Sequence, residues 1–173
     1  MISGKKIFLR PLKYEDWEKT IIWRNDLDFS ALIMSHPFPV TEELEKEWIK
    51  SIIEDKSNRS VHLGICLKDS EELIGLTKLF NINWISRNCY FGIFLGSKES
   101  RGKGIGKEVM ELIIDYSFNK LNLRKIILEV IETNQPAINL YKKMGFTKEG
   151  ELKEQVYNNE KYYGVIIMSL FNK

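Results

Sequence analysis

A glycine-rich loop between an apolar segment and an amphipathic segment constrains this chain more than any other feature. The apolar segment covers residues 90–95, a helix is expected from about Lys107, and the loop between them contains Arg101-Gly102-Lys103-Gly104-Ile105-Gly106. Glycine lets the backbone bend closely around a ligand because it has no Cβ. The first N–H groups of the following helix point back into the loop. Together with the two cationic side chains, this arrangement predicts a phosphate-binding site.

Two common phosphate-binding motifs do not fit the loop. A P-loop requires Ser or Thr after Gly-Lys, whereas Gly106-Lys107 is followed by Glu108. The dinucleotide fingerprint Gly-x-Gly-x-x-Gly requires a glycine at position 107, which is lysine. The pattern that fits is Arg-x-x-Gly-x-Gly at positions 101, 104 and 106. On the loop alone, a surface turn with two basic residues is an equal alternative.

A second segment makes a family resemblance specific. Residues 134–146 contain Asn-x-x-Ala-x-x-x-Tyr-x-x-x-Gly-Phe, which begins at Asn134 and includes Tyr141. The loop and this segment resemble the two signatures of the GNAT superfamily of acetyl-CoA-dependent N-acetyltransferases. The resemblance is specific over about residues 60–170 and holds only in outline before that. It implies an enzyme that moves an acetyl group from acetyl-CoA to a primary amine by direct attack on the thioester.

The expected fold is a single acetyltransferase domain over residues 1–173, in the α/β (α+β) class. A chain of 173 residues with 43% hydrophobic residues can build one packed core. The resemblance implies three α/β/α layers around a mixed, mostly antiparallel sheet with one parallel, splayed strand pair. Segments 90–95 and 125–130 flank a helical crossover, so they should form that parallel pair.

The remaining elements are read from periodicity and capping residues. Helices are expected at 16–25, after Thr41, after the glycine loop, and after Asn134, with a left-handed end at Gly145. Strands are expected at 7–9, 61–67 and 73–80, and residues 147–157 and 162–170 should form a final hairpin.

Composition argues against several other classes of function. The net charge is +2, from 26 basic and 24 acidic residues, so we expect no nucleic-acid partner and no membrane partner. Cys66 and Cys89 form no Cys-x-x-Cys pair and only His36 and His62 supply imidazoles, which predicts no metal site. No segment reaches membrane-spanning length, and two lone thiols suit a cytoplasmic protein.

The resemblance also implies where acetyl-CoA binds. Backbone groups on a splayed strand can hydrogen-bond the pantetheine arm like an added strand and polarise the thioester carbonyl. Asn134 is expected to contact pantetheine, to cap its helix, or to do both. The expected donor residues are Ile93, Phe94, Leu95, Arg101, Gly102, Lys103, Gly104, Ile105, Gly106 and Asn134.

Two catalytic roles are expected. The resemblance places Tyr141 near the thioester sulfur, where a phenol can protonate the leaving thiolate, although its helix stripe also suits a core tyrosine. The acceptor ammonium must lose a proton, and many relatives carry a glutamate where this chain has Tyr90. Glu129 is the best substitute, acting through water, and His36 is a second candidate. The base stays open.

The acceptor is the least constrained part. Trp23-Arg24-Asn25 and Lys78 resemble amino-sugar-nucleotide N-acetyltransferases of the pseudaminic acid type, in which Arg24, Lys78 and Trp84 would meet a diphosphate and a base ring. A small amine or amino sugar nucleotide is therefore the leading expectation. Ribosomal-protein N-terminal and polyamine acetylation are alternatives, and a non-catalytic acyl-CoA sensor is a third, against which Tyr141 speaks.

An acidic surface for a polyamine would come from the helix after Thr41. The spacing of the four glutamates in this segment spreads them around the helix, so a solvated helix face is the simpler interpretation. The long final hairpin and the many aromatic residues are compatible with a homodimer. The four glutamates are Glu42, Glu43, Glu45 and Glu47.

Overall fold

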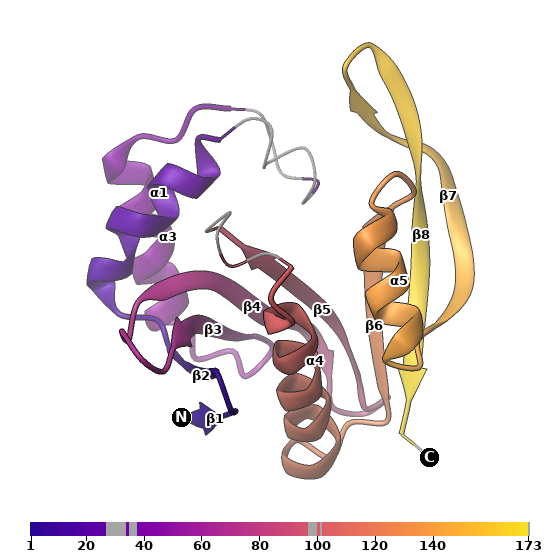
Figure 1. The fold of residues 1–173 in the computed structure, drawn as a ribbon, viewed down its shortest axis with the longest axis horizontal. Helices are drawn as coiled ribbons and strands as arrows, with labels where there is room; N and C mark the ends of the chain where they lie inside the picture. The colour runs from indigo at the N-terminus through magenta and orange to yellow at the C-terminus, as the bar shows by residue number, and fades with distance from the viewer. Residues whose placement is uncertain (27–33, 35–37, 97–99, 101, 173) are drawn as a thin grey trace.

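The computed structural model describes residues 1–26, 34, 38–96, 100 and 102–172. Its centre is an eight-stranded sheet in the order β1-β2-β3-β4-β5-β6-β8-β7 (Figure 1). Pairing between β5 and β6 is parallel and every other strand pair in this sheet is antiparallel. The strands are β1 (Ile2–Ser3), β2 (Ile7–Pro11), β3 (Val61–Leu67), β4 (Leu73–Asn83), β5 (Asn88–Leu95), β6 (Lys125–Ile131), β7 (Thr147–Asn158) and β8 (Lys161–Phe171).

Helices cover both faces of the sheet, which confirms the predicted three layers. On one face, α1 and α3 bury Trp23 and Ile49 against the sheet residue Leu76. On the other face, α4 and α5 belong to the larger core and bury Val109 and Ile138. The helices are α1 (Trp17–Arg24), α3 (Glu42–Ile53), α4 (Ile105–Asp115) and α5 (Gln135–Lys143), with a short 3-10 helix η1 (Tyr14–Asp16) and a π-helical turn η3 (Tyr116–Lys120).

Local capping chemistry sets the helix ends. The Thr41 hydroxyl accepts a hydrogen bond from the N–H of Leu44 at 3.3 Å, as expected of an N-cap. Helix α4 starts at Ile105, two residues before the predicted start, because Gly104 takes the N-cap position with a left-handed φ of 80°. Helix α5 ends before Gly145, whose φ of 91° confirms the predicted left-handed end.

The parallel pairing of β5 with β6 covers only three residue pairs. These pairs join Asn88 to Lys125, Cys89 to Ile126 and Tyr90 to Ile127. Beyond them, β5 stays paired with β4 as far as Leu95, and β6 stays paired with β8 as far as Ile131. The two half-sheets therefore diverge into a V that opens upward in Figure 1, which confirms the predicted splayed pair.

The C-terminal hairpin extends well beyond the rest of the sheet (Figure 1). Strands β7 and β8 pair up to Asn158 and Lys161, and the two residues between them, Asn159 and Glu160, have φ values of 47° and 62°. Positive φ at both turn positions matches the right-handed twist of the flanking strands. The expected hairpin is confirmed.

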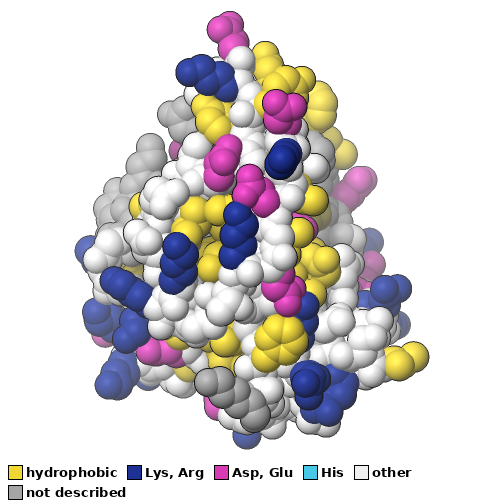
Figure 2. All heavy atoms as spheres, turned by 90° about the vertical axis from the view of Figure 1, so that its right-hand side faces the viewer, with side chains coloured by type: hydrophobic (Ala, Val, Ile, Leu, Met, Phe, Trp, Pro, Cys, Tyr) yellow, Lys and Arg dark blue, Asp and Glu magenta, His cyan; other side chains and the backbone are white. Residues whose placement is uncertain are grey.

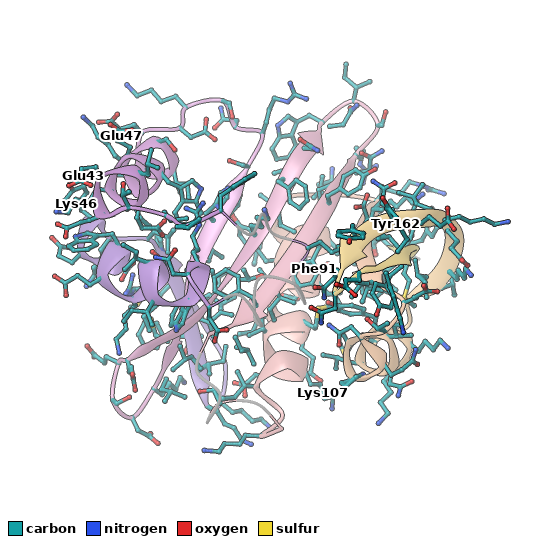
Figure 3. The ribbon with its side chains drawn as sticks, turned by 90° about the horizontal axis from the view of Figure 1, so that it is seen from above. Glu43, Lys46, Glu47, Phe91, Lys107 and Tyr162 are labelled. Atoms are coloured by element: carbon teal, nitrogen blue, oxygen red, sulfur yellow. The ribbon has the colours of Figure 1, made fainter. Side chains whose placement is uncertain are left out.

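A buried ion pair joins α1 to α3. Glu45 is 0% exposed and accepts hydrogen bonds from the Thr20 hydroxyl and, at 2.6 Å, from Arg24 Nη1. The interpretation of the glutamates as a solvated face is therefore wrong for Glu45, which shares the inward helix face with the buried Ile49, four residues later. Glu43 and Glu47 do lie on the outer side of α3 (Figure 3).

We expect Glu45→Ala to lower the free energy of unfolding by about 3 kcal/mol, since it leaves Arg24 without its counter-charge in a partly buried position. Glu47→Ala on the exposed side of the same helix is the matched control and should change it by less than about 0.5 kcal/mol. Urea denaturation followed by circular dichroism measures both. Equal stabilities of the two variants would contradict a structural role for the buried pair.

Candidate active site

The glycine loop leads directly into the first turn of α4. Gly102 and Gly104 have left-handed φ values of 74° and 80°, and a Cβ at either position would have no heavy atom within 4 Å, so both backbones border open space. Ile105 is buried in the core, so its side chain anchors the end of the loop. A Cβ at Gly106 would lie 3.4 Å from Leu140, so α4 packs closely on α5 here.

Two basic residues were expected in this loop. Lys103 is exposed, and its carbonyl oxygen accepts a hydrogen bond from Lys6 Nζ at 2.9 Å. Arg101 lies outside the described residues. The described loop therefore combines left-handed glycines, a free helix start and one exposed cation, which are the components of an anion site.

A carboxylate in the first turn of α4 is directed away from that site. Glu108 Oε1 accepts main-chain hydrogen bonds from Lys5 and, at 2.8 Å, from Lys6, with a longer one of 3.4 Å from Ile7. These bonds tie the start of α4 to the N-terminal strands. Sequence reasoning missed this contact, because its partners are backbone groups about one hundred residues away.

Residues 93–95 lie on β5, where it has left β6. Their antiparallel partners on β4 are Thr77 for Ile93, Leu76 for Phe94 and Gly75 for Leu95. The ring of Phe94 meets that of Trp23 edge to face, with centroids 5.8 Å apart, which anchors this end of β5 under the α1–α3 layer. The opposite edge of β5 faces into the V between the half-sheets.

Tyr141 belongs to the core on the α4–α5 side of the sheet. Its side chain is 8% exposed, and its ring centroid lies 6.0 Å from that of Phe146. Burial raises the pKa of the phenol to about 12, so it is neutral at physiological pH. The structure therefore bears out the core position, and a neutral phenol is also the form that can donate a hydrogen bond.

Asn134 caps α5, which is one of the two roles expected for it. Its side-chain oxygen accepts a hydrogen bond from the N–H of Ala137 at 3.3 Å. Within the described residues its amide nitrogen has no hydrogen-bond partner, so this donor is available to a ligand. Contact with pantetheine stays a prediction.

Of the expected bases, the structure describes Glu129, which does not lie in an enclosed site. Glu129 is exposed on β6, between the buried Leu128 and Val130, and pairs with Ile167 of β8. Side chains alternate between the two faces of a strand, so Glu129 lies on the same face of β6 as Ile127. Ile127 is the β6 partner of Tyr90. His36 lies outside the described residues. Glu129 as a base stays a prediction.

A cavity of about 360 Å³ lies between the α1–α3 layer and strands β3 to β5. Its wall includes Arg24 and Trp48 from the helices and His62 and Lys78 from the strands, and it reaches Ile93 on β5. No carboxylate lines it among the described residues. The cavity is therefore mostly apolar and aromatic, with Arg24, His62 and Lys78 as nitrogen-bearing groups in its wall, and it reaches the splayed strand at Ile93.

Register places the two strand residues of this cavity side by side. His62 pairs with Lys78, and Lys78 pairs with Gly92, whose missing side chain leaves room for the lysine stem. Lys78 Nζ lies 4.6 Å from the Phe80 ring centroid. Burial lowers the pKa of Lys78; burial and then the charge of Lys78 lower that of His62.

The sequence anticipated only part of this cavity. Arg24 and Lys78 line it as expected, but Trp84 does not: its indole N–H donates to the Asn58 carbonyl at 2.8 Å, outside the cavity. His62 and Trp48 were missed as lining residues. His62 reaches the cavity through its strand pairing with Lys78, sixteen residues later, and Trp48 reaches it because α3 packs on the sheet. Neither contact leaves a local pattern in the sequence.

Two searches of the described residues limit other kinds of site. No cluster of three or more His, Cys, Asp or Glu side chains that could hold a metal ion occurs there. None of the helices in this part of the chain is both long enough and apolar enough to cross a membrane.

Comparison with known proteins identifies the family. The model of the acetyltransferase (GNAT) domain matches residues 6–147. The chain is 34% identical to spermidine N(1)-acetyltransferase of Escherichia coli K12, over 99% of this chain and 89% of that protein. A crystal structure of spermidine N-acetyltransferase from Vibrio cholerae with CoA and spermine superposes with a TM-score of 0.89 at 30% identity, covering 97% of this chain and 96% of that one. A dodecameric structure of the Vibrio cholerae enzyme gives a TM-score of 0.80 at 30% identity, with 97% and 95% covered. The chain belongs to the GNAT acetyltransferase family.

Proposed function

We propose that this enzyme transfers the acetyl group of acetyl-CoA to a small primary amine held in the cavity between the α1–α3 layer and β3 to β5. One observation carries the proposal: the cavity reaches Ile93, on the stretch of β5 that has separated from β6. An amine in the cavity and a thioester in the V would meet at that strand. Direct attack needs the two reactants to be held close together in this way.

The donor would be bound by backbone more than by side chains. The pantetheine arm would lie in the V along residues 93–95, with the Asn134 amide as a further donor. Its diphosphate would accept hydrogen bonds from the N–H groups of residues 102–106, with Lys103 and Arg101 as cations. The open space beside Gly102 and Gly104 supports this placement.

Tyr141 is proposed to act on the leaving sulfur. Attack by the amine forms the C–N bond of the amide, and collapse of the tetrahedral intermediate breaks the C–S bond and leaves a thiolate. A phenol of pKa about 12 is a weaker acid than a thiol of pKa about 8.5. Full proton transfer from the phenol to the thiolate would therefore be uphill, so Tyr141 acts chiefly by donating a hydrogen bond to the developing charge.

Turnover with a panel of amines tests the proposed function. Release of free CoA thiol from acetyl-CoA would be followed with spermidine, an amino sugar, an amino sugar nucleotide and a peptide with a free N-terminus. We expect thiol release that depends on at least one amine. Binding of CoA with no release on any amine would instead favour the acyl-CoA sensor.

Two variants should separate donor binding from chemistry. Gly104→Val forces a β-branched residue into a left-handed conformation and should weaken CoA binding about tenfold. Tyr141→Phe should leave CoA binding near wild type and lower kcat about a hundredfold. Calorimetry with CoA and thiol release with the active amine measure the two effects.

Matched controls accompany this pair. Gly150→Val on β7, where valine suits a strand, should bind CoA normally, and Tyr14→Phe on the exposed surface should turn over normally. Full activity of Tyr141→Phe would remove Tyr141 from the mechanism. Normal CoA binding by Gly104→Val would remove the glycine loop from the donor site.

The proton acceptor is proposed from the cavity wall as well as from β6. His62 lines the cavity, and burial together with Lys78 holds its pKa below 6.5, with Asp55 acting in the opposite direction, so the ring is neutral at pH 7. Glu129, the residue expected from the sequence, would act through water. Both act only when deprotonated, so kcat/KM should fall as the pH drops through the pKa of the true base.

The pH profile decides between these two bases. We expect an acid limb of kcat/KM with a midpoint below 6.5 that disappears in His62→Gln and is unchanged in Glu129→Gln. The reverse pattern, with a midpoint near the ordinary glutamate pKa of about 4.3, would assign the role to Glu129.

A polyamine is a second candidate acceptor, and the comparisons favour it. The relatives above are named for spermidine, and identities of 30–34% extend over nearly the whole chain. Spermidine therefore belongs in the panel beside the amino sugar nucleotide that the sequence favours.

Assembly of several copies is also proposed. Figure 2 shows hydrophobic side chains at the surface among mixed charges on the face formed by the hairpin and α5, where Tyr157 and Tyr162 are more than 60% exposed. The Vibrio cholerae relative is dodecameric, which supports a multimer larger than the expected dimer. Sedimentation velocity distinguishes the monomer, the dimer and larger assemblies.

A further inference from the structure

The turn between β1 and β2 contacts both the glycine loop and the helix that follows it. Residues 4–7 form this turn. Lys6 Nζ donates a hydrogen bond to the Lys103 carbonyl at 2.9 Å, and Glu108 in the first turn of α4 accepts main-chain hydrogen bonds from the same turn. An N-terminal segment is thus attached at two points to the region that the proposed function assigns to the donor.

Glu108 fixes the position of this turn against α4. Its Oε1 accepts hydrogen bonds from three successive main-chain N–H groups, those of Lys5, Lys6 and Ile7. Successive N–H groups of this kind form a concave site for an anion, which the carboxylate fills. Gly4 permits the close approach, because a Cβ at position 4 would overlap Glu108 Oε1. The carboxylate therefore sets the place from which the Lys6 side chain extends.

Lys6 fixes a peptide plane that the loop itself holds weakly. Lys103 lies between Gly102 and Gly104, which both have left-handed φ values, and glycine changes its conformation at little steric cost. The carbonyl bound by Lys6 belongs to the peptide that joins Lys103 to Gly104. No cis peptide occurs among the described residues, and across a trans peptide the C=O and the N–H point in opposite directions. The Gly104 N–H is therefore directed away from Lys6.

We propose that Lys6 is a positioning residue of the donor site, which holds the Lys103 carbonyl so that the Gly104 N–H faces the diphosphate of acetyl-CoA. This inference rests on the proposed function, which places the diphosphate on the N–H groups of residues 102–106. Among the described residues the Gly104 N–H has no hydrogen-bond partner, so it is available to an anion. A loop that is fixed beforehand loses less entropy when its ligand binds.

Removal of the Lys6 ammonium tests this role. Lys6→Met keeps the length of the side chain but not its donor, and we expect it to bind CoA about fivefold more weakly in calorimetry. Lys5→Met is the matched control, since it removes the same charge one residue earlier from an exposed side chain. It should bind CoA within about twofold of the wild type. Lys6→Arg retains a donor and should recover most of the lost affinity.

Dephospho-CoA separates positioning from direct contact with the ligand. It keeps the diphosphate of CoA and lacks the 3′-phosphate. If Lys6 acts through the loop, Lys6→Met should weaken the binding of CoA and of dephospho-CoA by the same factor. Weaker binding of CoA alone would mean that Lys6 contacts the 3′-phosphate, and it would overturn the inference. Equal losses in Lys6→Met and Lys5→Met would also overturn it, because they would show a general effect of charge.

Stability and turnover complete the test. Lys6 is exposed, so Lys6→Met should unfold at the same urea midpoint as the wild type. With an active amine it should raise KM for acetyl-CoA and leave kcat near the wild-type value. A lower urea midpoint with unchanged CoA affinity would make Lys6 a purely structural residue and overturn the inference.

The same measurements keep this inference distinct from the proposed function. Normal CoA binding by Lys6→Met, beside weak binding by Gly104→Val, would overturn the inference and leave the glycine loop as the donor site. Thiol release on no amine, with CoA binding still dependent on Lys6, would contradict the proposed function alone.

Discussion

The early end of the pairing between β5 and β6 is the constraint on which the rest of the structure depends. Each strand is secured by its outer neighbour, β5 by β4 and β6 by β8, so the inner edges can separate after three residue pairs. The divergence places the glycine loop, α5 and the β5 end of the cavity around one opening, where the proposed donor site lies.

The two sides of that opening differ in how far they could be predicted. The donor side is made by local chemistry, in which a residue and its conformation lie within a few positions of each other. Asn134 over Ala137 and Gly145 at a helix end are both of this kind. Such features are visible in the sequence because they require particular residue types at fixed spacing.

The acceptor side depends on contacts between distant segments. Glu45 reads as one of four solvated glutamates until α1 packs on α3 and brings Thr20 and Arg24 to it. His62 becomes a cavity residue only through its pairing with Lys78. Because helix packing and strand register decide these positions, the sequence predicted the local features of the glycine loop and α5 more closely than the wall of the cavity, from which Trp84 is absent.

The link between Glu45 and Arg24 also bears on how substrate choice can diverge within this fold. Arg24 contributes to the cavity wall and to the joint between two helices, so a change there alters folding as well as ligand recognition. Lys78 carries no comparable duty, because its neighbours are the bare backbone of Gly92 and the face of an aromatic ring. Mutation at position 78 therefore breaks no ion pair among the described residues, so the charge of the cavity wall can change there at little risk to the domain.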